Sequence, residues 1–374
     1  MSKDTTSYPI SKEYYPLLTH GISEEAPKIV EGIRAEVLSS PSNDLTQFDN
    51  LRITDKTSIP LPVPIVTINN EIICTECNLT TISGASKSGK SAFTSIILAG
   101  AISQTGNIDG LEGLNVKPNT SGKAVIHFDT EQARHKHQKN LITILDRCGF
   151  SNCPDYLLSY NIRALEISCY ELMVLQICTA AFLKFKGLHL IVIDGIADFI
   201  SDVNDPIQAN AIVKFFEDLA IKFSCPIITI VHTNPGSDKE RGHLGSQCQR
   251  KSESVISVKS EGDISFIEPK FLRMAGKGNI PTLQFTYDKE KGYHVGAGIK
   301  QSSNEAKVEQ NKLIITSIIS KVFSGQKSFT YSESVEAIKE ASGKGTNKCK
   351  EWIVEAQQYG LIFKDTDNRY RLAV

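Results

Sequence analysis

The stretch Leu79–Leu98 reads LTTISGASKSGKSAFTSIIL, and it decides the fold. It begins with a β-branched run typical of a strand and ends with an apolar run typical of a helix. Between them the pattern G-x-x-x-x-G-K-[ST] is met by Gly84, Ala85, Ser86, Lys87, Ser88, Gly89, Lys90 and Ser91. Such a loop turns backbone N–H groups toward a phosphate, which the positive end of the following helix also attracts. The stretch therefore predicts an α/β fold with a phosphate-binding loop.

Three side chains are the expected contacts of a nucleoside triphosphate and its metal ion. The Lys90 ammonium can reach the β- and γ-phosphates, and the Ser91 hydroxyl can ligate Mg²⁺. About 100 residues later, the apolar run 188–193 ends in Asp194, which is typical of a Walker B strand whose carboxylate holds the metal or its water. The expected cofactors are therefore ATP and Mg²⁺.

The region from about 78 to 235 alternates strand and helix patterns. Strand-like runs lie at 79–83, 124–128, 156–160, 188–193 and 227–231, and helical patterns lie near 90–104, 132–148, 168–186 and 207–223. This alternation predicts a mainly parallel sheet covered by helices on both faces. From 253 to about 296 the helical patterns stop, and four short runs predict antiparallel strands or hairpins.

Two further strand ends carry polar side chains that suit hydrolysis. The run 124–128 is followed by Asp129 and Glu131, and the ends of parallel strands meet at the ligand crevice. Glu131 is the favoured group to orient and deprotonate the attacking water, with Asp129 as the alternative or as a helix cap. His232 ends the run 227–231, where it can sense the γ-phosphate or can be a histidine satisfied by its strand-end neighbours.

These elements, in this order, resemble a RecA-type ATPase core. The segments FDTEQ (128–132), IDGIAD (193–198) and RGHLGS (241–246) are similar to those of RepA-type replicative helicases and related ATPases of plasmids and mobilisable elements. The resemblance covers about residues 62–295. It implies that Glu131 is the catalytic base, that His232 is the γ-phosphate sensor, and that the chain forms a homo-oligomeric ring, a hexamer being favoured.

The resemblance also implies a basic finger, supplied to the ATP by a neighbouring subunit. Lys270 and Arg273, at the end of a late strand-like run, are the favoured candidates. Three other basic residues could serve as the finger instead: Arg241, Arg250 and Lys251. The alternative for all five residues is that they are solvated surface charges without such a role.

The segment Gly236–Lys251 is predicted to be a flexible loop that contacts single-stranded DNA. It holds three glycines, and in the related helicases this region lines the central channel. It contains no aromatic residue, which favours contacts with the DNA backbone over base stacking. A surface loop without a ligand is the alternative. The candidate DNA contacts here are Lys239, Arg241, His243, Arg250 and Lys251.

Residues 306–374 show the order helix, helix, helix, hairpin, which resembles a winged-helix domain. Its third helix would begin with three candidate DNA contacts, Lys344, Asn347 and Lys348. From Glu305 to Val374 there are 11 Lys and Arg against 9 Asp and Glu, a net charge of only +2. A winged helix that docks a protein is therefore a serious alternative.

The domain plan has three parts: a polar, proline-punctuated arm (1–60) with one helix expected near 26–38, an ATPase core (61–299) and the winged-helix-like unit (306–374). The whole chain contains 41 Lys and Arg and 42 Asp and Glu. This balance excludes a protein that coats nucleic acid with a uniformly basic surface. Neither a long apolar run nor a signal-peptide core is evident, so we expect a cytoplasmic protein without a membrane partner. The nine cysteines, Cys74 and Cys77 included, are expected to be reduced packing thiols, with a zinc site as the lesser alternative.

The sequence therefore predicts an ATP-driven DNA motor, and specifically a ring-forming helicase for replication or transfer of a plasmid or mobile element. The alternative is an ATP-switched DNA-binding or regulatory factor that does not unwind DNA. A small-molecule kinase is disfavoured, because Glu131 suits the activation of water and no acceptor pocket is evident.

Overall fold

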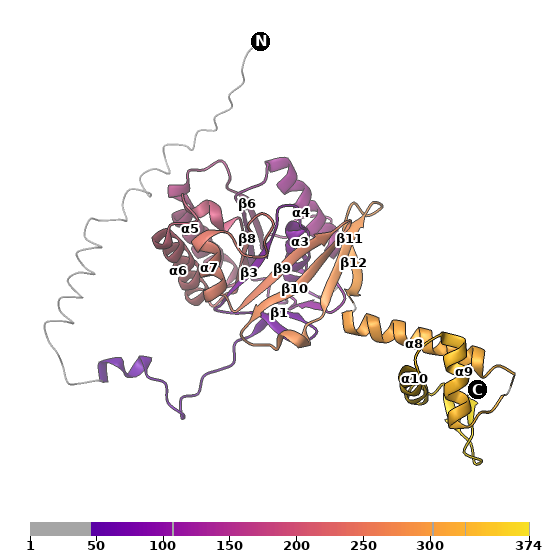
Figure 1. The fold of residues 1–374 in the computed structure, drawn as a ribbon. Helices are drawn as coiled ribbons and strands as arrows, with labels where there is room; N and C mark the ends of the chain where they lie inside the picture. Colours follow the sequence, from indigo (N-terminus) through magenta and orange to yellow (C-terminus); the bar gives the residue numbers. More distant parts are fainter. Residues whose placement is uncertain (1–45, 107, 301–302, 326, 374) are drawn as a thin grey trace, which may run out of the picture. The chain divides into compact units, whose positions relative to one another are not determined.

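The computed structural model describes residues 46–106, 108–300, 303–325 and 327–373. Within them, nine strands form one sheet in the order β12-β11-β10-β9-β3-β8-β7-β5-β6 (Figure 1). Their bounds are β3 (Leu79–Gly84), β5 (Ala124–Asp129), β6 (Leu157–Asn161), β7 (Leu188–Asp194), β8 (Ile227–His232), β9 (Ser254–Glu261), β10 (Ile264–Leu272), β11 (Thr282–Asp288) and β12 (Tyr293–Lys300).

The sheet has a parallel part and an antiparallel extension. From β6 to β9 all neighbouring strands are parallel, and β9, β10, β11 and β12 are joined by antiparallel pairing. The predicted mainly parallel α/β sheet is confirmed, and its strand order is compatible with a RecA-like fold. The strands predicted after residue 253 belong to this same sheet.

Helices cover both faces of the sheet. They are α3 (Lys90–Ile102), α4 (Arg134–Cys148), α5 (Tyr170–Phe185), α6 (Pro206–Lys222) and α7 (Gly242–Lys251). Along β5, Val125 packs in the core that contains α3 and Ile144 of α4, whereas Ile126 packs in the core that contains α5, α6 and Leu244 of α7. Because consecutive residues of a strand point to opposite faces, α3 and α4 cover one face and α5, α6 and α7 the other (Figure 1).

The four helices predicted between the strands are confirmed, with ends shifted by a few residues. The start of α6 is determined by its first residues, since Asp205 Oδ1 accepts the N–H groups of Ile207 and Gln208, and Pro206 lies in the first turn.

The prediction of a flexible loop over Gly236–Lys251 is wrong for its second half. Residues Gly242–Lys251 form α7, whose Leu244 and Cys248 lie one helical turn apart and are both buried in the core. This i, i+4 apolar pair gives the segment a face to pack, so it folds as a helix despite its glycines.

A second, three-stranded sheet has the antiparallel order β2-β1-β4, with β1 (Pro64–Ile68), β2 (Glu71–Thr75) and β4 (Leu114–Val116). β4 has only three residues, so no sequence pattern marks it as a strand. Cys74 of β2 is fully buried in the main core, as expected of a packing thiol, whereas Cys77 is exposed.

Residues 303–373 contain α8 (Ser303–Val322), α9 (Tyr331–Ser342), α10 (Thr346–Gln358), β13 (Ile362–Lys364) and β14 (Tyr370–Leu372). This is the predicted order of three helices and a hairpin. The unit has its own core, in which Ile319, Ile338 and Trp352 are buried. Thr330 caps the second of these helices, because Thr330 and Glu333 form a reciprocal capping box.

By compactness the chain divides after Leu61, one residue from the predicted boundary. In the first unit the described part, 46–61, contains one 3₁₀ turn, Thr46–Leu51. The helix predicted near 26–38 lies outside the described residues.

One described segment, Ile167–Phe185, is long and apolar enough by length and composition to cross a membrane, contrary to the expectation that no such run exists. It includes α5, whose Val174, Cys178 and Ala181 are buried against the sheet. In this structure α5 is therefore one of the helices that cover the sheet.

Candidate active site

The loop between β3 and α3 has the backbone geometry that its glycines predict. Gly89 has φ +100°, a left-handed conformation in which a Cβ atom would lie 2.7 Å from Ser265 Oγ and 2.9 Å from the Phe285 ring. A Cβ at Gly84 would lie 2.3 Å from the carbonyl oxygen of Val258. Both glycines are therefore required for the close approach of the loop to β9, β10 and β11.

Lys90 is held between this loop and the end of β8. Its side chain is largely buried, and Nζ donates to the carbonyl oxygens of Gly84 at 2.9 Å and Ala85 at 2.7 Å. Nζ also lies 3.3 Å from His232 Nδ1. Burial lowers the pKa of Lys90, and the nearby carboxylates of Glu131 and Asp194 oppose that shift.

Four strand ends meet at one edge of the sheet, as parallel strands require. Gly84 lies opposite His232 in the β3–β8 pair, and Asp129 lies opposite Asp194 in the β5–β7 pair. The predicted loop, metal-binding carboxylate, catalytic carboxylate and sensor therefore come together at the carboxyl ends of neighbouring strands.

Asp194 has the environment of a cation ligand. It is buried, and burial together with the neighbouring charges of Asp129 and Glu131 raises the pKa of Asp194 to about 7. Ser91, in the first turn of α3, lines the same cavity as Asp194. A hydroxyl and a carboxylate are hard oxygen donors that suit Mg²⁺. Since the described residues contain no cluster of three His, Cys, Asp or Glu side chains that could hold a metal, an ion here would take further ligands from phosphate oxygens and water.

Glu131 and His232 form a direct pair. The distance from Glu131 Oε1 to His232 Nε2 is 3.0 Å, and the side chains are 36% and 31% exposed. With Nε2–H donating to Glu131, His232 Nδ1 can accept from the Lys90 ammonium. The hydrogen bond from His232 lowers the pKa of Glu131, so this carboxylate is ionised at neutral pH.

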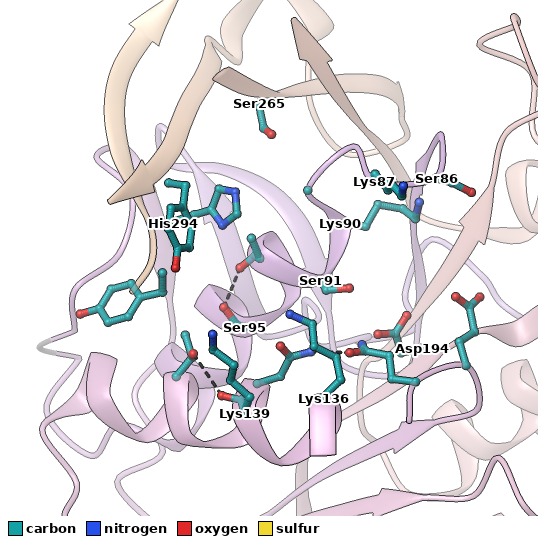
Figure 2. Close-up of a pocket in the computed structure, with 18 of the residues that line it drawn as sticks. Ser86, Lys87, Lys90, Ser91, Ser95, Lys136, Lys139, Asp194, Ser265 and His294 are labelled. Carbon is teal, nitrogen blue, oxygen red and sulfur yellow. Dashed lines mark hydrogen bonds between the residues drawn. The ribbon is translucent and has the colours of Figure 1, made fainter. Parts of the chain in front are cut away.

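The cavity at this edge has a volume of about 620 Å³ and extends well beyond the loop (Figure 2). One wall is the polar face of α4, from which Lys136 and Lys139 extend toward the cavity (Figure 2). The opposite wall belongs to β11 and β12, with Tyr287, Tyr293 and His294. None of these residues is among the site residues predicted from the sequence. The spacing of the two lysines was a usable signal, whereas the aromatic wall lies about 150 residues further along the chain.

Arg147 ties these two walls together. It is almost fully buried, and its guanidinium donates to the carbonyl oxygens of Asp109 and, on β12, His294. Its Cζ lies 4.5 Å from the centre of the Tyr293 ring. The end of α4 and the β11–β12 hairpin are thereby fixed to one another, which shapes the far end of the cavity.

The two favoured finger candidates make contacts within their own chain. Lys270 Nζ lies 2.6 Å from Glu240 Oε1, and the Glu240 side chain is 1% exposed. The Arg273 guanidinium donates to the carbonyl oxygen of Arg250. Neither Lys270 nor Arg273 is among the described residues that line the cavity. The structure therefore does not bring them to the site within one subunit.

The candidate DNA contacts fall into two groups. Lys251 pairs with Glu217 at 3.1 Å, Lys348 pairs with Glu351 at 2.8 Å, and Arg250 donates to the side chain of Gln247. The other candidates are exposed and form no ion pair with the described residues: Lys239, Arg241, His243, Lys344 and Asn347. These exposed groups are the ones available to a ligand.

Two comparisons with known proteins found no match. No family model matches the chain. No curated protein matches it significantly either.

Proposed function

We propose that this chain is a RecA-like P-loop ATPase that works as a DNA motor, and specifically as a ring-forming helicase in replication or transfer of a plasmid or mobile element. The observation that carries the proposal is the convergence of Asp194, Glu131, His232 and five residues of the loop on one cavity; the loop residues are Ser86, Lys87, Gly89, Lys90 and Ser91. A strand order compatible with a RecA-like fold supports it.

In this proposal the residues divide the work of hydrolysis. The loop N–H groups and Lys90 bind the triphosphate, and Ser91 and Asp194 would hold Mg²⁺, which neutralises and orients the phosphates. Glu131 positions a water molecule and takes its proton as the water oxygen attacks the γ-phosphorus and ADP leaves. His232, bonded to Glu131 and next to Lys90, responds to the loss of the γ-phosphate.

The size of the cavity supports a nucleotide and not inorganic polyphosphate as the ligand. The triphosphate occupies the loop end, and the remaining space lies between α4 and the aromatic wall of Tyr287, Tyr293 and His294. A flat base fits such a wall, because aromatic rings and amide groups offer stacking and edge contacts.

The connection from the sensor to a basic surface supports a motor. The N–H of Arg241 donates to the carbonyl oxygen of His232 at 3.0 Å, so the segment 233–241 leaves the sensor and returns to it. A shift of His232 on hydrolysis would be transmitted to Lys239 and Arg241, which are exposed and suited to DNA phosphates. We propose single-stranded DNA as the partner, a homo-oligomer, a hexamer being favoured, as the active form, and the cytoplasm as its location.

A second function has one observation in its favour. The C-terminal unit carries a net charge of only +2, and Lys348 at its proposed recognition helix is paired with Glu351. In an ATP-switched DNA-binding or regulatory factor, ATP would only control whether the subunits assemble, and the protein would not unwind DNA.

Strand separation of a forked duplex distinguishes these functions. We expect the wild-type protein with ATP and Mg²⁺ to separate the strands, and the Lys90→Ala variant, which lacks the phosphate-binding ammonium, to separate none. DNA-stimulated hydrolysis without strand separation would replace the helicase by the regulatory factor. Equal unwinding by the two proteins would contradict the proposed site.

A further inference from the structure

A hydrogen-bonded series of buried and half-buried polar side chains lies next to the turn that carries Glu131. It joins β5, α4 and β6, and it contains Asp129, His137, Ser159 and His127. Asp129 Oδ2 lies 2.8 Å from His137 Nδ1, His137 Nε2 lies 2.9 Å from Ser159 Oγ, and Ser159 Oγ lies 3.1 Å from His127 Nδ1. The two imidazole rings are stacked with centres 5.3 Å apart.

One tautomer assignment satisfies every hydrogen bond of this series of side chains. With His137 Nδ1–H donating to Asp129 Oδ2, His137 Nε2 can accept from the Ser159 hydroxyl, and Ser159 Oγ can accept from His127 Nδ1–H. His127 Nε2 is then an unprotonated nitrogen. Among the side-chain atoms of these four residues, it is the one without a hydrogen-bond partner. Burial lowers the pKa of His127 to about 4, which agrees with the neutral ring.

The other carboxylate oxygen of Asp129 determines the turn that carries Glu131. Asp129 Oδ1 accepts the backbone N–H of Glu131 at 3.0 Å and that of Gln132 at 2.8 Å. The Gln132 carbonyl oxygen is held from the other side by Asn161 Nδ2 at 2.8 Å. Asp129 is fully buried, so the two oxygens of one immobile carboxylate hold His137 and the catalytic turn at the same time.

We propose that His137 is a positioning residue for hydrolysis, because it holds the Asp129 carboxylate in the orientation that places Glu131 against the attacking water. This inference rests on the proposed function for the role of Glu131. It assigns to Asp129 a supporting task in place of the alternative role of base, since both its oxygens are already engaged.

The physical consequence of losing His137 is specific. Burial alone would raise the pKa of Asp129, and the hydrogen bonds from His137 and Gln132 outweigh it and hold that pKa below its usual value. Without the imidazole, the buried carboxylate lacks a partner for Oδ2 and reorients, and the Glu131 turn loses its fixed acceptor. A small displacement of a catalytic group is enough to slow the chemical step, whereas the phosphate-binding loop is not touched.

Three variants of the full-length protein test this inference. His137→Leu removes the donor to Asp129 while retaining an apolar side chain of moderate size. His137→Asn is the matched control, because the Asn amide nitrogen is bonded to Cγ as Nδ1 is and can donate to the same oxygen. Ser159→Ala removes only the more distant hydroxyl and leaves the contact between His137 and Asp129 in place. Thermal melting of each variant establishes that it is folded.

Two readouts are measured on each variant: ATP turnover against affinity for a non-hydrolysable ATP analogue, and amide hydrogen exchange in a peptide covering residues 130–133. We expect His137→Leu to lose about tenfold to hundredfold in turnover, with analogue affinity changed by less than about twofold, and to exchange faster at Glu131 and Gln132. His137→Asn should stay within about threefold of wild-type turnover, and Ser159→Ala should lose less than His137→Leu.

The outcomes separate this inference from the proposed function. Wild-type turnover and unchanged exchange in His137→Leu would overturn the inference, and so would equal losses in His137→Leu and His137→Asn. If the wild-type protein does not hydrolyse ATP, the proposed function fails, and the exchange at residues 130–133 still decides whether His137 positions this turn.

Discussion

Replacing Glu131 by glutamine is expected to lower ATP turnover about 10²–10⁴-fold while ATP remains bound. Glutamine retains the size of the side chain and an oxygen that accepts from His232 Nε2–H, which lies 3.0 Å from Glu131 Oε1. The amide cannot take a proton from water, so the variant lacks the proposed base. Because the hydrogen bond from His232 lowers the pKa of Glu131, the wild-type group is ionised and ready at neutral pH.

Single-turnover phosphate release and ATP-analogue binding, measured side by side, test this expectation. Glu166→Gln is a matched control, since Glu166 is exposed and precedes the 3₁₀ turn Ile167–Cys169, outside the cavity lining. A Glu131→Gln protein that hydrolyses ATP like the wild type would remove Glu131 from the mechanism.

Replacing Lys270 by alanine is expected to reduce the free energy of unfolding by about 3 kcal/mol. Lys270 is the ion-pair partner of Glu240, a carboxylate that is 1% exposed, with 2.6 Å between Nζ and Oε1. Removing the ammonium leaves this carboxylate buried and unpaired, which is the costly way to break such a pair. This loss of stability would occur in the isolated subunit, and it does not depend on whether Lys270 acts as a finger in a ring.

Denaturant unfolding monitors this loss, with Lys239→Ala as the control. Lys239 is exposed and forms no ion pair with the described residues, so its removal should change the stability by less than about 0.5 kcal/mol. The double variant Lys270→Met, Glu240→Met should recover much of the loss, since no charge is then left unpaired. A Lys270→Ala protein as stable as the wild type, with hydrolysis abolished, would instead favour the finger role.

The parts of the fold that the sequence predicts correctly are those determined by local chemistry. The loop 84–91 is recognised because its glycines must adopt conformations that other residues resist, as the surroundings of Gly84 and Gly89 show. Asp194 and His232 end continuous apolar strands, and the alternation of strand and helix patterns places such ends at one edge.

The remaining features depend on contacts between distant segments. Tyr293 reaches the cavity only because β9–β12 extend the parallel sheet, which no local pattern shows. The partners of Lys270 and Arg273 lie in other segments of the chain. The chain from Asp129 to His127 joins two strands and a helix, so the separate histidines carry no signal in the sequence.

The most direct test of the central claim is phosphate release from ATP and Mg²⁺ by the wild-type protein and by Lys90→Ala, with and without single-stranded DNA. Lys90 is the group that would contact the β- and γ-phosphates, and the loss of one such charge stabiliser is expected to cost about 10²–10³-fold in turnover. We predict that the wild-type protein releases phosphate, faster with DNA, and that Lys90→Ala falls by that factor under both conditions. The same rate of release from both proteins would contradict an ATPase site at this loop.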